Sequence, residues 1–471
     1  MTGGLKETAS RLAIAAMFCV AATLLYAAKT AQAADFGGDC CADLEERVAE
    51  LEATTVRKGN KKVSVQVYGK VNRFVAAWDD GAEQNTYVDN NSYSSTRFGF
   101  RGNAKISGDW SGGYRMEVED KTALSKDTNQ FVPGDDPGFG VLAVRHSYMY
   151  LGNKNIGELR WGLTSSPKDD ITKDTHVGGA IIDTMHSDFY LNRSFFLRPK
   201  DFNTELGLSV FDWSDIQRCY SSSSAVFDCS TRRNMVVFQS KKFFETSVKD
   251  TGLWFNWGWG EDDIWSAAAR YKGEWDNWKL GGGIAYESFA DERVNQGGGG
   301  LAGFKRDIQE WGASASIKHK PTGLFVFGAW SSSQDDDTNT INAGVFTGSS
   351  MPTMEAWDVQ VGIQKSWWEL GATTFWGGYT QADNGIGGFG PTRAIAPGQL
   401  PSVLVPTEIT GSETDKWYLA FDQEVVSSAM DLYVVYQHID GDLDLVDSTL
   451  NSVNAPIDGF DVIYSGARIY F

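Results

Sequence analysis

The sequence predicts an all-β fold, a sixteen-stranded antiparallel transmembrane β-barrel that follows a short N-terminal helical segment. Three observations lead to this fold class. After residue 62 the chain repeatedly alternates apolar and polar residues, the pattern of a strand with one apolar and one water-facing side. Sixteen such segments are separated by connections that are alternately short and long. Finally, 17 Trp, 17 Tyr and 51 Gly accompany a mildly polar mean hydropathy of -0.31, as expected of many two-faced strands.

Composition and charge exclude several classes of protein. The 471 residues include 61 acidic and 42 basic side chains, a formal net charge of -19 that argues against a nucleic-acid partner. Only 11 residues are proline, so proline-rich disorder is excluded, and the 51 glycines do not follow a collagen repeat. The chain is therefore expected to fold and to act on something other than nucleic acid.

Residues 1–33 read as a secretory signal peptide. The apolar run from Leu12 to Ala28 follows Lys6 and Arg11 and precedes the small-residue triplet that ends at Ala33. An uncleaved anchor would need about 20 apolar residues and would not need the triplet. We expect cleavage after Ala33 and export of the mature chain.

Four cysteines remain after the predicted cleavage, and an exported protein meets an oxidising compartment. Cys219 and Cys229 are the preferred disulfide, because they bracket the Ser-rich segment from Tyr220 to Asp228. Cys40 and Cys41 are neighbours, and a bond between neighbours is strained. Pairing between chains and a reduced state both remain open for them.

Residues 34–61 are predicted to form a periplasmic N-terminal segment. Within residues 43–58, Leu44, Val48 and Leu51 share one helical stripe, the spacing of a short coiled coil. Two heptads are marginally stable alone, so a charged helical linker is an equal alternative to self-association.

The barrel domain is predicted over residues 62–471, and its first strand sets the pattern. Val63, Val65 and Val67 lie on one side, whereas Gln66, Tyr68 and Lys70 lie on the other. The sixteen segments are 62–76, 96–107, 112–121, 143–151, 156–165, 231–243, 251–259, 264–273, 277–289, 309–319, 322–333, 354–366, 367–380, 414–426, 429–440 and 459–471. The long connections are 77–95, 122–142, 166–230, 290–308, 334–353, 381–413 and 441–458, and 260–263 is the short exception on that side.

This alternation of connection lengths is typical of a barrel that crosses an outer membrane. Such barrels have an even number of strands, short periplasmic turns and long extracellular loops. Closing the sheet removes the free edges, whose unpaired backbone groups would find no water in the bilayer. Aromatic residues at strand ends suit the two interfacial girdles: Trp78, Trp110, Tyr150, Trp161, Trp330, Trp357, Trp367 and Trp368.

Three short motifs carry a resemblance to a known family. The chain ends in Ser-Gly-Ala-Arg-Ile-Tyr-Phe, similar to the terminal assembly signal of outer-membrane barrels, here Gly466, Ile469 and Phe471. Ile469 departs from the more usual aromatic residue. With Val67-Tyr68-Gly69-Lys70 in the first strand and Phe98-Gly99-Phe100-Arg101-Gly102 in the second, residues 62–471 resemble the general bacterial porins, most closely the alphaproteobacterial branch.

The resemblance implies a function and a set of partners. It implies a passive, water-filled diffusion channel for small hydrophilic solutes and ions in the bacterial outer membrane. It also implies a homotrimer, contact with outer-membrane lipid and the barrel-assembly machinery, and a third extracellular loop folded into the pore. The alternative is a secreted β-rich surface or binding protein without a channel, which would not need detergent for extraction.

The third loop supplies the expected pore constriction. It is the longest connection and carries acidic residues, whereas the strands around it carry cations, three of them on the polar side of the 96–107 strand. An acidic loop that faces a basic wall would set a transverse field across a narrow passage. The acidic loop residues are Asp169, Asp170, Asp174, Asp183 and Asp188, and the basic wall residues are Arg97, Arg101, Lys105, Arg145 and Arg160.

The sequence gives little reason to expect catalysis, a cofactor or a metal. The five histidines lack metal-ligand spacing, and there is no Gly-x-Ser-x-Gly elbow. Asp440, Asp442, Asp444 and Asp447 lack the Gly and terminal Glu of a helix-loop-helix calcium site. A barrel enzyme would need a Ser and a His together at the rim, and no such pair is evident.

Overall fold

The computed structural model describes residues 63–132, 142–173, 193–198, 212–216, 232–246, 248, 250–261, 263–293, 304–335, 353–385, 406–447 and 452–471. Several predictions fall outside these residues. They are the signal peptide, the N-terminal helical segment, the Cys219–Cys229 disulfide, and the loop residues Asp174, Asp183 and Asp188.

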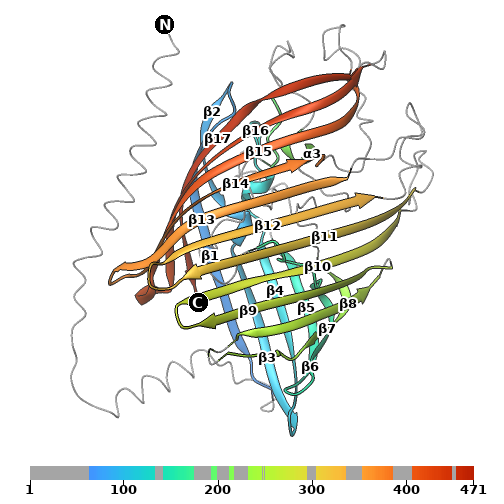
Figure 1. Ribbon diagram of the computed structural model, residues 1–471, viewed down its shortest axis with the longest axis vertical. Coiled ribbons are helices and arrows are strands. Elements are labelled where there is room, and N and C mark those ends of the chain that lie inside the picture. The colour runs from blue at the N-terminus through green and yellow to red at the C-terminus, as the bar shows by residue number, and fades with distance from the viewer. Residues whose placement is uncertain are drawn as a thin grey trace.

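The described residues form one antiparallel sheet that closes into a barrel, because β1 pairs with β17 on one side and with β2 and β3 on the other (Figure 1). The strands are β1 (Gln66–Asp79), β2 (Gln84–Asn90), β3 (Arg97–Ser107), β4 (Trp110–Asp120), β5 (Leu142–Asn153), β6 (Gly157–Ser165), β7 (Arg232–Ser240), β8 (Gly252–Gly260), β9 (Trp265–Trp275), β10 (Trp278–Arg293), β11 (Phe304–His319), β12 (Leu324–Asp335), β13 (Met354–Trp368), β14 (Gly371–Asp383), β15 (Pro406–Val425), β16 (Met430–Asp447) and β17 (Ser452–Tyr470).

Sixteen strand positions surround the barrel, which confirms the predicted fold class, although seventeen strands are distinguished. The difference arises beside β1. The C-terminal half of β1, Arg73–Asp79, pairs with β2, and its N-terminal half, Gln66–Lys70, pairs with β3. The 3₁₀ turn η2 (Ser92–Ser94) interrupts what is otherwise one strand.

The strand β2 lies inside the segment 77–95, which the sequence predicts to be a loop. Its polar sequence, QNTYVDN, shows no clear alternation, because Val88 is its one outward apolar side chain. The hairpin is instead specified by its turn. The carboxylate of Asp80 accepts hydrogen bonds from the backbone N–H groups of Ala82 and Glu83, and Gly81 takes the left-handed φ of +87° that this turn requires.

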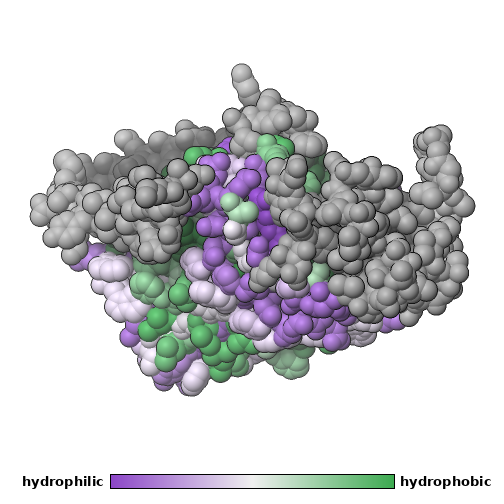
Figure 2. All heavy atoms as spheres, turned by 90° about the horizontal axis from the view of Figure 1, so that it is seen from above, coloured by the Kyte–Doolittle hydropathy of each residue, from purple (hydrophilic) through white to green (hydrophobic). Residues whose placement is uncertain are grey.

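The outward surface is apolar and carries a belt of aromatic side chains. Cross-strand neighbours in the belt are Trp259 with Trp265, Tyr286 with Trp311, Trp330 with Trp357, and Tyr379 with Trp417. In the view from above, hydrophobic residues gather beside hydrophilic ones on this face (Figure 2). This arrangement matches the girdle of a membrane barrel.

Two of the predicted girdle residues point the other way. Trp78 is only 3% exposed and packs inside the barrel, with its ring 4.8 Å from that of Phe195. Tyr150 also turns inward, where its hydroxyl accepts a hydrogen bond from Asn103. Position at a strand end does not decide which side a residue faces. That depends on the register of the alternation.

Part of the third loop returns along the inside of the barrel. Phe195, Leu197 and the short helix α3 (Trp213–Ile216) belong to one buried apolar cluster with Trp78 and Phe460. The ring of Phe195 lies 4.8 Å from that of Phe460 on β17. The helix α3 lies against β15, where the Ser412 hydroxyl donates to the carbonyl of Ile216. Among the described residues no helix is long and apolar enough to span a membrane.

Candidate functional site

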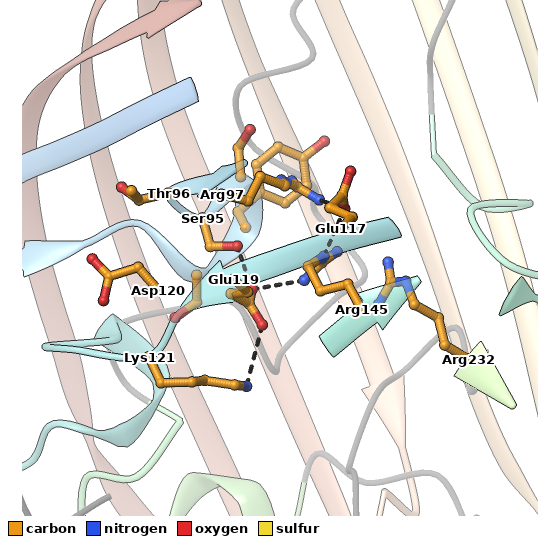
Figure 3. A network of polar contacts seen from close by, with 12 residues as sticks. Ser95, Thr96, Arg97, Glu117, Glu119, Asp120, Lys121, Arg145 and Arg232 are labelled. Carbon is orange, nitrogen blue, oxygen red and sulfur yellow. Dashed lines mark hydrogen bonds and ion pairs between the residues drawn. The ribbon is translucent and has the colours of Figure 1, made fainter. Parts of the chain in front are cut away.

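A polar network lies on the inner wall where β3, β4 and β5 meet (Figure 3). At its centre is Glu117 on β4, which is 1% exposed. Its carboxylate lies 2.6 Å from Arg115 Nη2, 3.2 Å from Arg145 Nε and 3.5 Å from Arg97 Nη1. One carboxylate therefore binds three guanidinium groups from three adjacent strands.

Glu119 extends the network toward the outer end of β4. Its carboxylate lies 2.6 Å from Arg145 Nη1 and 3.2 Å from Lys121 Nζ, and it also accepts a hydrogen bond from the Ser95 hydroxyl. Alternation along β4 explains why both carboxylates face inward, because Met116 and Val118 between them take the outward positions.

A β-bulge places Arg145 in this network. Glu117 is paired with His146, whereas the next residue, Val118, is paired with Val144, so Arg145 is the extra residue on β5. A bulge changes the alternation and redirects a side chain. As a result Arg145 and His146, although adjacent, both lie on the inner side, and Arg145 reaches both glutamates.

The third loop begins inside the barrel. We call residues 166–173 the loop stem. Its Lys168 is completely buried, with Nζ 3.3 Å from a carboxylate oxygen of Glu310 on β11. Arg270 on β9 donates to the carbonyls of Pro167 and Asp169, at 2.9 and 2.5 Å, and Ser314 donates to the carbonyl of Ile171. These contacts hold the stem against the inner surface of β9, β10 and β11.

Two glycines make room for the stem. Ile171 is 1% exposed and packs on Gly283 of β10 and Gly312 of β11. A Cβ atom at Gly312 would lie 2.5 Å from Ile171 Cγ2, and one at Gly283 would lie 2.9 Å from Ile171 Cδ1. The absence of side chains at these positions therefore allows the close approach of the stem.

The stem also contacts the start of β7 and the turn η2. Asp169 Oδ2 lies 3.9 Å from Arg232 Nη2 at the start of β7. Lys173 Nζ lies 4.1 Å from the ring centre of Tyr93 in η2, on the wall formed by β1 and β3. Asp170 pairs with Lys173 within the stem, at 3.5 Å.

The predicted basic residues occupy two levels of the wall. Arg97 and Arg145 belong to the glutamate network, beside the loop stem. Arg101 lies lower on β3 and donates to Gln66, and Arg160 pairs with Glu158 at 3.4 Å and donates to Gln239. Lys105 is exposed near the end of β3.

Sequence reasoning missed four residues of the site: Glu117, Glu119, Arg115 and Arg232. The alternation in β4 does place Arg115, Glu117 and Glu119 on the water-facing side, but it does not reveal that the two glutamates pair with the arginines of β3 and β5. Arg232 follows the third loop, and only the pairing of β7 with β6, Arg232 opposite Ser165, brings it back to the stem.

The predicted assembly signal closes the barrel. The backbone N–H of Phe471 donates to the carbonyl of Gly69, and the N–H of Gly69 donates back to Phe471. The ring of Phe471 covers Gly69 so closely that a Cβ there would lie 2.4 Å from it. Gly466 is covered in the same way by Tyr433, and Ile469 faces outward with 42% exposure.

A closed barrel with an apolar belt outside and charged groups inside defines a membrane-channel class of protein. The comparison with known families agrees. Residues 16–444 match the model of the Gram-negative porin family, so the chain belongs to that family. The protein is therefore an outer-membrane β-barrel porin, and the assignment to an alphaproteobacterial branch stays a prediction.

Similar solved structures have low sequence identity. OmpT of Vibrio cholerae, expressed in the outer membrane, is 12% identical with a TM-score of 0.49, covering 88% of this chain and 99% of its own. An anion-selective porin from Comamonas acidovorans is 14% identical with a TM-score of 0.49, covering 87% and 100%. The outer membrane channel DcaP of Acinetobacter baumannii is 14% identical with a TM-score of 0.43, covering 88% and 99%. No curated protein matches the sequence.

Proposed function

We propose that this porin is a passive, water-filled diffusion channel for small hydrophilic solutes and ions, narrowed where the third loop enters the lumen. The observation that carries the proposal is the loop stem. Its buried Lys168–Glu310 pair and its Ile171 contact fix the stem to the inner wall of β9–β11. A loop bound on the inside of a barrel reduces the passage at that level.

The charges near the stem support a transverse field. Asp169 and Asp170 lie on the stem, Arg97 and Arg145 lie on β3 and β5, and Arg232 lies at the start of β7, next to the stem. Asp169 Oδ2 lies 3.9 Å from Arg232 Nη2. Asp174, Asp183 and Asp188 would add to the acidic side. Such a field orients polar solutes and disfavours apolar ones.

We further propose a homotrimer without catalytic activity, assembled in the outer membrane by the barrel-assembly machinery. The resemblance to trimeric porins supports the oligomer, and the family is one of channels. A secreted surface protein is disfavoured, because the outward apolar belt would then face water.

The channel is tested with the purified protein in a planar lipid bilayer. We expect stepwise conductance increments that grow with salt concentration, because the pore is filled with water. A boiled sample is the control. Absence of increments from folded protein would contradict a diffusion channel.

The trimer is tested by extraction and electrophoresis. We expect recovery from the membrane fraction only with detergent, and migration at three times the monomer mass until the sample is boiled. Recovery as a soluble periplasmic monomer would contradict both the trimer and the membrane location.

A further inference from the structure

The ion pairs around Glu117 and Glu119, together with the Asp169–Arg232 pair, contain more positive than negative charge. They join five cations to three carboxylates, so two positive charges remain uncompensated within the described residues. The cations are Arg97, Arg115, Lys121, Arg145 and Arg232, and the carboxylates are Glu117, Glu119 and Asp169.

The excess charge is concentrated on one side of the network. The guanidinium group of Arg232 lies next to that of Arg145 (Figure 3), and the charges of both Arg97 and Arg232 act on Arg145. Glu117 and Glu119 hold Arg145 from β4, and Arg232 approaches it from β7. Asp169, at 3.9 Å, compensates Arg232 only weakly.

Unused hydrogen-bond donors occur in the same place. The buried Nε atoms of Arg97 and Arg232 have no hydrogen-bond partner among the described residues. The side chains of Arg97, Arg145 and Arg232 are 17%, 12% and 30% exposed. The side chains are thus largely desolvated but keep some exposure, and an unpaired buried donor costs free energy until a ligand satisfies it.

We propose that Arg97, Arg145 and Arg232 form a binding site for a divalent oxyanion group, such as phosphate, on the path through the channel. The inference rests on the proposed function, because the anion reaches the site through the water-filled lumen. Planar guanidinium forks bind tetrahedral and carboxylate oxyanions with paired hydrogen bonds. Two uncompensated charges match a divalent anion, and Glu117 and Glu119 restrict its approach to the side of Arg232.

The probe is inorganic phosphate, added to the reconstituted full-length channel while the chloride current is recorded. An ionic strength of about 0.15 M keeps the screening length near 8 Å, so distant charges contribute little. We expect phosphate to reduce the wild-type current with a saturable concentration dependence. The variant Arg232→Gln should raise the half-blocking concentration about tenfold, the loss of roughly one charge-assisted hydrogen bond.

Lys105→Gln is the control, because it removes a positive charge from the exposed end of the same strand, β3. Its half-blocking concentration should stay within about twofold of wild type. A twofold change in affinity corresponds to well under 1.4 kcal/mol of binding free energy. Should Arg232→Gln not yield folded channels, Arg97→Gln replaces it with the same expectation. Equal effects of the site and control variants would overturn the site and indicate general attraction of anions to the wall.

The experiment distinguishes failure of the oxyanion site from failure of the channel function. A wild-type protein that conducts normally but shows no saturable phosphate block would overturn the oxyanion site and leave the channel intact. A folded protein that does not conduct would overturn the proposed function itself. The variant Arg232→Lys keeps the charge and loses the fork, so a full wild-type block by Arg232→Lys would overturn the assigned fork geometry.

Discussion

Glu117 is the residue on which the inner-wall network depends. Its carboxylate is buried and accepts from Arg97, Arg115 and Arg145, each of which would otherwise repel the others. Burying like charges close together is unfavourable unless a counter-charge lies between them. The carboxylate therefore fixes the positions of the arginines and also lowers the positive potential that they present to the lumen.

Replacing Glu117 with Gln should change both stability and selectivity. Removal of one partner from a buried ion pair costs about 3 kcal/mol, because the remaining charges stay desolvated. The three arginines would also present more positive potential, so the reversal potential in a salt gradient should shift toward anion preference. Glu158→Gln, which affects the lower pair with Arg160, is the control. An unchanged reversal potential in Glu117→Gln would contradict this role.

Lys168 holds the loop stem through a buried ion pair with Glu310 on β11. Both Lys168 and Glu310 are fully buried, so Lys168→Met should cost about 3–5 kcal/mol of folding stability. The loss should appear as a lower temperature at which the folded band disappears from a gel. The stem should also loosen, seen as larger current fluctuations. The double variant Lys168→Met/Glu310→Gln should recover part of the stability, because Glu310 no longer leaves an unpaired charge, although the buried Glu287 still loses the nearby cation. A double variant as unstable as the single one would argue against the ion pair.

At the level of elements, the stem is positioned by the strands that it touches rather than by its own conformation. Ile171 occupies a shallow site made by Gly283 and Gly312, and Arg270 and Ser314 satisfy the carbonyls beside it. Backbone polar groups inside a barrel need such partners, because an unpaired carbonyl away from water is costly. The strands β9, β10 and β11 thus determine where the stem lies.

A methyl group at Gly312 tests this positioning. A Cβ there would lie 2.5 Å from Ile171, so Gly312→Ala should displace the stem toward the lumen, cost about 1–3 kcal/mol and lower the single-channel conductance. Gly328→Ala on the neighbouring strand β12 is the control, because the nearest atom to its Cβ is 3.7 Å away. Equal conductances in the two variants would show that the stem does not narrow the pore.

The strands could be predicted from the sequence, and the stem could not. Alternation is local, so it identified all sixteen strand positions and placed Arg97 on the polar side. The partner of Arg145 depends on a bulge, which shifts the register by one residue without a sequence signal of its own. The site for Ile171 depends on glycines more than 100 residues later in the chain, which become neighbours only when the barrel closes.

At the scale of the whole molecule, the net charge of -19 does not determine which ions the channel prefers. Charges on outer loops are screened by salt within about 8 Å, whereas charges on the inner wall act on ions at close range and in a lower dielectric. The described inner wall beside the stem carries an excess of cations. An acidic protein is thus compatible with a locally positive passage.

A comparison of inner and outer charges tests this separation. The double variant Arg97→Gln/Arg101→Gln removes two cations from the wall, so the ratio of cation to anion permeability should rise several-fold and the conductance should increase as the passage widens. Neutralising Asp335, Asp336 and Asp337, at the outer end of β12 and just beyond it, removes three charges but should shift the reversal potential much less, because bulk salt screens them. Both sets are measured as reversal potentials across the same salt gradient. Equal shifts from the two sets would mean that selectivity follows the total charge of the protein, and that neither the loop stem nor the arginine wall forms the filter.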